Sequence, residues 1–321
     1  MPYKKTLINA SCSYNTKPLK ILFYGFRHGH VNTLYKNAAA SDKYEIAACV
    51  EENDEARAAA EKALETEFSD ISYDEWLKTD IDAVAIGGAY GDRGKAIIKA
   101  LEAGKHVIAD KPLCTDLNQL KKIRALAGKK HLKVGCMFEL RYTPSAVCAK
   151  KILEEGKLGE VRNITFMGQH QINLDRRPLW YFEKGKHGGT INDIAIHGID
   201  MVTYLTGLKV SRVNSARVWN SYAKPYPDFK DCALFMAELD NGAGLLADVS
   251  YSSPAWKVPT YWKFCIWCEK GLITFCYFDK TVSVFELGVP GEQVIDGTQS
   301  YTDSVLDATE TTLKIQKVAD R

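Results

Sequence analysis

The chain has 321 residues, 46% of them hydrophobic and 26% charged, which is ordinary for a soluble globular protein with room for two cores. Its formal net charge is +2 and it has no long basic run, so we expect no nucleic-acid partner. No apolar run approaches the roughly 20 residues that span a bilayer, and the N-terminus lacks the apolar core of a secretory signal. These features predict a cytoplasmic protein that binds small molecules and no membrane.

The first half of the chain alternates between strand-like and helix-like segments. A polar tail occupies residues 1–18. Apolar runs then occur at residues 19–24, 45–50, 82–86, 106–109 and 132–137. Between them lie helical patterns that end near residue 41 or span residues 54–64, 93–102 and 117–127. This alternation predicts an α/β domain over residues 19–140, with a doubly wound parallel sheet.

After residue 141 the pattern changes. It predicts a helix at 143–155, a strand at 161–172, a helix that ends at Gly207, and a last helix at 303–321. Residues 210–287 are rich in β-branched and aromatic residues and predict about five or six strands with hairpin turns at 240–242 and 269–271. Residues 141–321 therefore form a second predicted α/β domain, whose sheet is open and mostly antiparallel.

Aromatic side chains are unusually frequent in this strand region. A single-layer sheet has only one face that its own helices can cover, and a large apolar patch usually marks an interface. The surplus therefore predicts a homo-oligomer. The aromatic residues concerned include Trp256, Tyr261, Trp262, Phe264, Trp267 and Phe278.

The nine cysteines lie scattered through the chain, several of them in apolar strand-like segments, and predict reduced, buried thiols. Cys265 and Cys268 form one CxxC motif. In a strand, however, residues three apart point to opposite faces. We therefore predict neither a metal site nor redox chemistry at this motif.

The first predicted strand runs into the turn GFRHGH. A full dinucleotide fingerprint would place glycines at 25, 27 and 30, but only Gly25 is in register. Glu51 ends the second strand, where an acid accepts hydrogen bonds from the adenosine ribose. Together these features favour a nucleotide site. Its candidate residues are Gly25, Arg27, His28, Gly29, His30 and Glu51.

Within this turn, Arg27 is either a ligand of the cofactor pyrophosphate or a solvated surface residue. Glu51 would repel a 2′-phosphate, which favours NAD(H) as the cofactor. Arg27 and Arg57 could reach such a phosphate, so NADP(H) stays open.

Lys111 follows the fourth predicted strand in the segment GKHVIADKPLCT. A lysine is usually a surface charge. This one lies between an apolar strand and Pro112, at the carboxyl end of a parallel strand, where such folds bind ligands. It is therefore a candidate site residue.

The segment GGTINDIAIHGID, residues 188–200, is the most informative stretch. At about 100° per residue, a helix places Asp193, His197 and Asp200 on one face. The pair Asp193 and His197 can belong to a solvated helix face, be hydrogen-bonded locally, or form part of a zinc site. Zinc needs a third ligand, and the other histidines offer no HxxxH pair, so we predict no metal.

With these motifs in this order, the chain resembles the Gfo/Idh/MocA oxidoreductases over nearly all of residues 19–321. The segment ALEAGKHVIADKPL resembles the family's AleaGkhVlcEKPl. Further likenesses are IDAVAIGG, ELRYTP, EGKLGEV and the helix GGTINDIAIHGID, which resembles GG-x-l-x-D-x-G-x-H-x-x-D. The resemblance implies a Rossmann domain followed by an α/β domain whose exposed sheet face commonly forms an oligomer interface.

Carried over by position, the resemblance implies Lys111, Asp193 and His197 as the catalytic residues. Asp110 replaces the family's usual glutamate and would contact the nicotinamide ribose. The family's Thr-Pro turn is replaced here by a segment in which Gly87, Gly88 and Tyr90 are the candidate cofactor contacts. Weaker candidates for substrate contacts are Arg141, His170, Tyr181 and Lys186.

The implied activity is an NAD(P)-dependent dehydrogenase or reductase. Its substrate would be the secondary alcohol or ketone of a sugar, cyclitol or related polyol. His197 would exchange the hydroxyl proton, Lys111 would bind the reacting oxygen, and Asp193 would orient the imidazole or hold a neighbouring substrate hydroxyl. Two alternatives stay open: a non-catalytic nucleotide or sugar sensor, which the altered glycine turn favours, and a dehydrogenase of non-sugars such as dihydrodiols.

Overall fold

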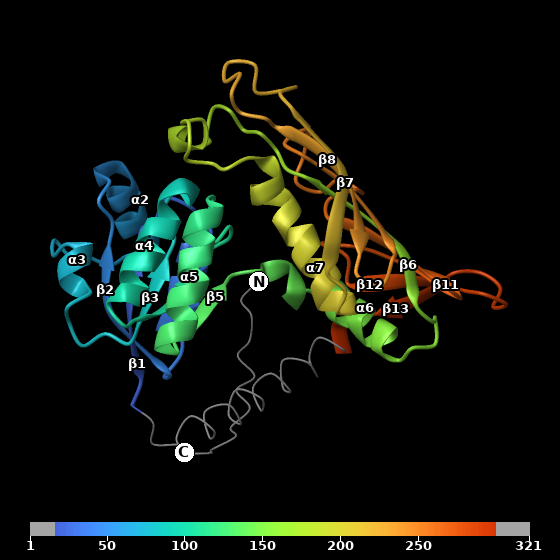
Figure 1. Ribbon diagram of the computed structural model, residues 1–321, viewed down its shortest axis with the longest axis horizontal. Coiled ribbons are helices and arrows are strands. Elements are labelled where there is room, and N and C mark those ends of the chain that lie inside the picture. The colour runs from blue at the N-terminus through green and yellow to red at the C-terminus, as the bar shows by residue number, and fades with distance from the viewer. Residues whose placement is uncertain (1–16, 300–321) are drawn as a thin grey trace.

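The computed structural model describes residues 17–299, so the helix predicted at 303–321 and most of the N-terminal tail lie outside the described residues. The chain forms two halves, each built on one sheet (Figure 1). The first sheet has five strands and the second has eight.

The first sheet has the order β2-β1-β3-β4-β5, and all its strand pairs are parallel. Its strands are β1 (Leu19–Tyr24), β2 (Tyr44–Val50), β3 (Ala83–Ile86), β4 (His106–Ala109) and β5 (Val134–Cys136). The helices are α1 (His30–Ala39), α2 (Asp54–Leu64), α3 (Tyr73–Trp76), α4 (Tyr90–Glu102) and α5 (Leu117–Lys130). The short helix α3 was not predicted.

Neighbouring residues of β1 point into two different cores, as expected for a strand covered on both faces. Leu22 packs with Ile97 of α4 and Ile123 of α5. Phe23 packs with Val31 of α1 and Ala60 of α2. The helices therefore lie on both faces, which confirms the doubly wound sheet.

The second sheet has the order β13-β12-β11-β10-β6-β9-β8-β7, and every pair is antiparallel except β6 with β9. Its strands are β6 (Val161–Gln169), β7 (Val210–Trp219), β8 (Cys232–Leu239), β9 (Gly244–Ser250), β10 (Lys263–Cys268), β11 (Gly271–Cys276), β12 (Thr281–Glu286) and β13 (Gln293–Asp296). Six of them lie within 210–287, in agreement with the upper predicted number.

Helices α6 (Pro144–Glu154) and α7 (Ile196–Thr206) cover the face of this sheet that is turned toward the first half (Figure 1). Val202 and Leu205 of α7 share a core with Phe166 and Ile266 of the sheet. A Cβ at Gly198 would lie 2.2 Å from the Phe166 ring, so glycine permits this close approach. The opposite face carries exposed Leu234, Met236, Leu246 and Trp267.

The aromatic residues on which the predicted homo-oligomer was based do not all lie on the open face, and the homo-oligomer itself stays a prediction. Trp267 is exposed on the open face, but Phe264 lies in the core. Four other members, Trp256, Tyr261, Trp262 and Phe278, line a cavity instead. Hydrophobicity alone does not distinguish an open sheet face from the wall of a cavity.

Four of the eight described cysteines are buried, and the others, Cys114, Cys136, Cys265 and Cys276, are partly exposed. The expectation of uniformly buried thiols was therefore wrong for these four. Within residues 17–299, no helix is long and apolar enough to cross a membrane.

The segment before Gly188 crosses back to the first half of the chain. The amide of Gly91 donates to the carbonyl oxygen of Lys186 at 2.7 Å, and Lys186 Nζ pairs with Asp92 at 2.7 Å. A Cβ at Gly91 would lie only 2.0 Å from the carbonyl oxygen of Gly185. Backbone contact therefore joins the two halves at the start of α4.

Candidate active site

Lys111 follows β4, at the carboxyl end of the parallel sheet, and reaches across to the second half of the chain. Its Nζ lies 2.7 Å from Asp193 Oδ1 and 3.1 Å from the Asp193 main-chain oxygen. Both side chains are buried. The predicted site residues Lys111 and Asp193 therefore form a buried ion pair between the two halves.

Asp193 receives further hydrogen bonds on its other carboxylate oxygen. The Tyr251 hydroxyl donates to Oδ2, and His187 Nε2 lies 3.2 Å from the same atom. The amide of Gly189 donates to His187 Nδ1, so the proton of a neutral His187 is on Nε2. Burial raises the pKa of Asp193, but Lys111 and His187 outweigh it and hold this pKa well below its usual value.

A π-helical turn, η3 (Ile191–Ala195), places Asp193, and α7 follows with His197. His197 is buried, and its Nδ1 has no hydrogen-bond partner among the described residues 17–299. Burial and the charge of Lys111 hold the pKa of His197 well below 6.5, so its imidazole is neutral at neutral pH. The hydrogen bonds of Asp193 go to Lys111, His187 and Tyr251, so Asp193 does not orient His197, the first of its two predicted roles. The second, holding a neighbouring substrate hydroxyl, stays a prediction.

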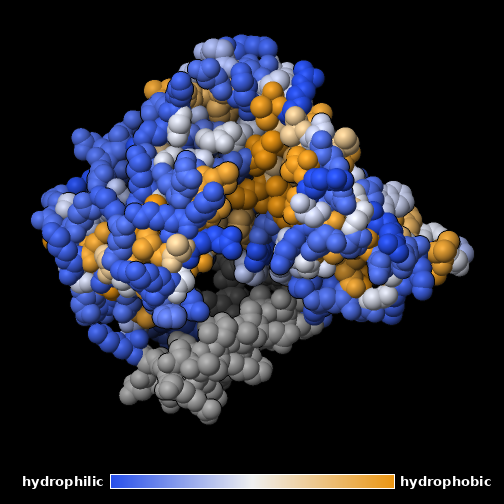
Figure 2. Space-filling model, in the orientation of Figure 1, coloured by the Kyte–Doolittle hydropathy of each residue, from blue (hydrophilic) through white to orange (hydrophobic). Residues whose placement is uncertain are grey.

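Lys111, Asp193 and His197 line one cavity of about 700 Å³. His170 and Tyr181, predicted as substrate contacts, line it too, and His170 Nδ1 is a second buried nitrogen without a partner. Aromatic side chains form much of the remaining wall: Trp256, Tyr261, Trp262, Tyr277 and Phe278. In Figure 2, hydrophobic residues gather in the hollow between the two halves of the molecule.

A second cavity of about 390 Å³ lies over the nucleotide end of the first sheet. Gly25, Arg27, Glu51 and Gly88 line it. Gly25 has φ +78°, and a Cβ there would lie 2.6 Å from the Gly88 amide nitrogen, so the two loops touch. A Cβ at Gly87 would collide with Val31, which gives Gly87 a packing role beneath the cavity.

Glu51 directly follows β2, at the predicted end of the second strand, and its carboxylate accepts from the amides of Phe26 at 2.5 Å and Asn53 at 2.9 Å. Each oxygen keeps a further lone pair for a ligand. Arg57, the arginine that left NADP(H) open, is bound by Glu61, Asp70 and the Phe68 carbonyl. Its guanidinium is therefore occupied within the protein.

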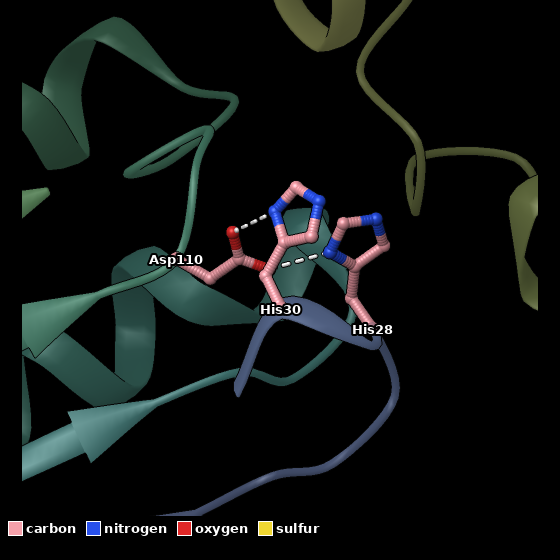
Figure 3. A group of neighbouring side chains, drawn as sticks. All are labelled: His28, His30 and Asp110. Carbon is pink, nitrogen blue, oxygen red and sulfur yellow. Dashed lines mark hydrogen bonds and ion pairs between the residues drawn. The ribbon is translucent and has the colours of Figure 1, made fainter. Parts of the chain in front are cut away.

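His28, His30 and Asp110, all predicted as cofactor contacts, form one group (Figure 3). His28 Nδ1 lies 2.6 Å from Asp110 Oδ2, and His30 Nδ1 lies 3.0 Å from Oδ1. Arg93 Nη2 also donates to Asp110 at 2.9 Å. Burial lowers the pKa of His28 to about 4, although Asp110 opposes this shift.

This group meets the distance requirement for a metal site that the sequence did not reveal, since its ligand atoms lie within 4.8 Å of one another. The Arg93 guanidinium, however, already neutralises the Asp110 carboxylate, so this group does not require a metal cation. The Asp110 side chain is fully buried, and its contact with the nicotinamide ribose stays a prediction. In the structure Asp110 holds His28 and His30.

Three other predicted contacts lie outside both cavities. Tyr90 is fully buried, and its hydroxyl bonds that of Tyr181 at 2.9 Å. Arg141 pairs with Asp200, with Nε 2.7 Å from Oδ2, and joins the turn η1 (Glu139–Tyr142) to α7. Lys186 forms the ion pair with Asp92 described above. These residues support the site rather than line it.

Sequence reasoning missed several residues that hold the site together: Arg93, Arg177, His187 and Tyr251. Arg93 is fully buried and donates to the carbonyl oxygens of Gly88, Lys111 and Pro112. None of the four stands in a motif. Only the apolar neighbours on α4 hinted that Arg93 is buried.

Fold and site together define a two-domain protein with a dinucleotide-type sheet and a buried Lys-Asp pair at the junction with an open-sheet domain. Residues 20–138 match the model of an oxidoreductase family with an NAD-binding Rossmann fold. Residues 147–274 match the GFO/IDH/MocA C-terminal domain. The chain belongs to the Gfo/Idh/MocA oxidoreductase family, and its first half is an NAD-binding Rossmann domain.

Two curated relatives illustrate the family. Levoglucosan dehydrogenase of Pseudarthrobacter phenanthrenivorans is 35% identical over 141 residues, which are 42% of this chain and 35% of that protein. The scyllo-inositol 2-dehydrogenase (NAD(+)) of Bacillus subtilis is 32% identical over 192 residues, 58% of this chain and 54% of that protein. The chain thus spans about half, or less, of the length of these curated relatives.

The fold also matches solved structures. A levoglucosan dehydrogenase in complex with NADH and levoglucosan has a TM-score of 0.75 and 25% identity, covering 87% of this chain and 80% of that one.

Proposed function

We propose that this protein is an NAD-dependent dehydrogenase or reductase for the secondary alcohol or ketone of a sugar, cyclitol or related polyol. One observation carries the proposal: the buried Lys111–Asp193 pair and the neutral His197 line one cavity beside an NAD-binding domain. The dehydrogenases of levoglucosan and scyllo-inositol among its relatives agree with this substrate class.

The residues of the first domain fit a dinucleotide. The touching glycines Gly25 and Gly88 leave room that a Cβ would fill, and α1 begins directly behind this turn. The amides at a helix N-terminus bind phosphate groups. We assign the ribose hydroxyls to Glu51, whose charge opposes a 2′-phosphate, and the pyrophosphate to Arg27. Because the Arg57 guanidinium is already hydrogen-bonded to Glu61 and Asp70, it is not available for a 2′-phosphate, which supports NAD(H) over NADP(H).

In the proposed mechanism, bound NAD supplies the hydride acceptor. Lys111 uses two of its three ammonium hydrogens on Asp193 and keeps one for the reacting oxygen of the substrate. Its charge stabilises the developing alkoxide in a site away from bulk water. Neutral His197 accepts the hydroxyl proton, and Asp193 fixes Lys111 while Tyr251 and His187 fix Asp193.

The test is a panel of polyols and keto-sugars with both nicotinamide cofactors, read at the nicotinamide absorbance. We expect turnover with NAD, and loss of turnover in Lys111→Gln. Lys121→Gln, which removes an exposed lysine of α5 outside both cavities, serves as the matched control and should stay active. The altered turn, with Arg27 and His30 in place of glycines, favours one rival. NADH binding without turnover of any panel member would support that rival, a non-catalytic sensor.

We also propose that the protein is a homo-oligomer, joined through the open face of the second sheet. Leu234 and Met236 of β8, Leu246 of β9 and Trp267 of β10 all expose apolar surface there. Met236 pairs with Leu246 in register, so these two apolar side chains are neighbours across β8 and β9, while β6 separates them from Trp267. An exposed patch of this kind usually marks an association surface.

A further inference from the structure

Arg177 lies in the connection between β6 and the turn η2 (Leu179–Tyr181), and its guanidinium is held in one orientation. Nε donates to the Ile172 carbonyl at 2.7 Å and Nη2 to the Gln171 carbonyl at 2.6 Å. The guanidinium carbon lies 4.7 Å from the ring centre of Tyr181 and 4.8 Å from that of Tyr251. Two carbonyl groups and two aromatic rings therefore fix this cation before any ligand arrives.

This cation has no anionic partner within residues 17–299. No described carboxylate lies within ion-pair distance of Arg177, whereas Arg93, Arg141 and the adjacent Arg176 each have one. A guanidinium carries five N–H donors, and the two carbonyl bonds leave three of them for a ligand. Arg177 is half-buried in the wall of the 700 Å³ cavity that holds Lys111 and His197.

The charges around this cavity do not cancel. Lys111 and Asp193 neutralise each other, which leaves Arg177 and Lys257 against Glu139 alone among the permanently charged lining residues. Burial and then the charge of Lys111 lower the pKa of His170 to about 3, so His170 offers a hydrogen bond and no charge. The charged residues that line the cavity therefore have a net positive charge, which favours an anionic ligand.

One side chain connects the cation to the proposed reaction centre. The Tyr251 ring lies under the Arg177 guanidinium, and the Tyr251 hydroxyl donates to the carboxylate that holds Lys111. Arg177 and Lys111 are thus linked through the Tyr251 side chain and the Asp193 carboxylate, and both line the same cavity, so a single small molecule can reach both.

We infer that the cavity selects a polyhydroxy substrate that carries an anionic group, a carboxylate or a phosphate ester, with Arg177 as its counter-ion. The inference rests on the proposed function, because it assumes that the reacting alcohol or ketone lies at Lys111. A fixed guanidinium fork matches the paired oxygens of either anion. Aromatic rings across the cavity would pack against the apolar face of the carbon chain.

Arg177 also borders a hollow of about 250 Å³ that Arg27, Gly29 and Arg176 line, beside the glycine turn. The same guanidinium could therefore bind the pyrophosphate of the cofactor, which has the same oxygen chemistry. The experiment must separate these two sources of anion.

The test measures ligand binding to the NADH-loaded protein by calorimetry, with sorbitol, gluconate and sorbitol 6-phosphate as probes on the same six-carbon skeleton. We expect gluconate or sorbitol 6-phosphate to bind about tenfold or more tightly than sorbitol. Arg177→Gln should abolish this preference and leave NADH affinity unchanged. Arg124→Gln, which removes an exposed arginine of α5 that lines neither the cavity nor this hollow, is the matched control and should keep both.

Equal or absent binding of all three probes to the wild type would overturn the inference, and this comparison decides even where Arg177→Gln does not fold. A preference for the acids that persists in Arg177→Gln would overturn it too. Weaker NADH binding with an intact preference would assign Arg177 to the cofactor instead. The two proposals can fail separately, because binding is measured without turnover. Acid-selective binding by a protein that shows no turnover would refute only the proposed dehydrogenase activity. Turnover of neutral polyols without a preference for acids would refute only the anion site.

Discussion

The buried pair of Lys111 and Asp193 allows a quantitative prediction about stability. Lys111→Met keeps most of the side-chain length and removes the charge, which leaves the Asp193 carboxylate buried without its cation. Removing one partner of a buried ion pair costs about 3–5 kcal/mol of unfolding free energy. Tyr251 and His187 would still donate to the carboxylate, so we expect about 3 kcal/mol, at the lower end of this range.

The reciprocal change, Asp193→Asn, strands the Lys111 ammonium with one main-chain oxygen 3.1 Å away and should cost a similar amount. The double variant leaves no unpaired charge. Its loss should therefore be smaller than the sum of the single losses by about 2–3 kcal/mol. Urea unfolding of the ligand-free protein at pH 7, followed by tryptophan fluorescence, measures all three. Five of the six tryptophans lie after residue 141, so the signal reports mainly on the second domain.

Stability should also depend on pH in a definite direction. The pKa of Asp193 in the folded protein lies below its ordinary unfolded value of about 3.9, so its contribution is complete above that pH and is lost as the pH falls through the folded pKa. Without Lys111, burial raises this pKa, and the loss should begin at less acidic pH. Single losses that add within about 0.5 kcal/mol, or identical pH curves, would refute the ion-pair argument.

The other predictions concern chemistry, cofactor choice and assembly. His197→Ala should reduce turnover about a hundredfold or more with nearly unchanged NADH affinity; near-wild-type turnover on a verified substrate would contradict this. Burial and Lys111 lower the pKa of His197, so the acidic limb of kcat/KM should fall well below pH 6.5; a limb centred at 6.5 would show that the imidazole is more solvated than in the structure. By fluorescence titration, NADH should bind more tightly than NADPH because of Glu51, and equal affinity would show that this acid does not set the preference. Sedimentation should detect an oligomer that Met236→Lys weakens, whereas a 35.9 kDa monomer at micromolar concentration would count against the proposed interface.

Much of the fold could be predicted from the sequence because its elements are strongly periodic. The alternating pattern of the first half identified all five parallel strands, whose central members are buried on both faces. The short helix α3 escaped notice because four residues are too few to establish a period. The π-helical turn at Asp193 was also missed, since a regular helix was assumed at about 100° per residue.

The site could be predicted only where its residues belong to a local motif. Lys111, Asp193 and His197 stand in recognisable segments, and all three line the cavity. The groups that hold Asp193 do not, since Tyr251 lies 58 residues away at the end of β9. Likewise, nothing in the local sequence indicates that Asp110 is buried against Arg93, because that contact depends on how α4 packs over the loop after β4.

The backbone crossing at Gly91 constrains how this protein can evolve or be recombined. Any larger residue at position 91 would push into the carbonyl oxygen of Gly185, so a side chain in one domain would displace the chain of the other. A chimera that takes its first domain from a relative must therefore also bring a glycine at this position, or exchange the crossing segment with it. Gly91 and Gly185 therefore form a matched pair across the domain junction, where the two backbones approach with no side chain between them.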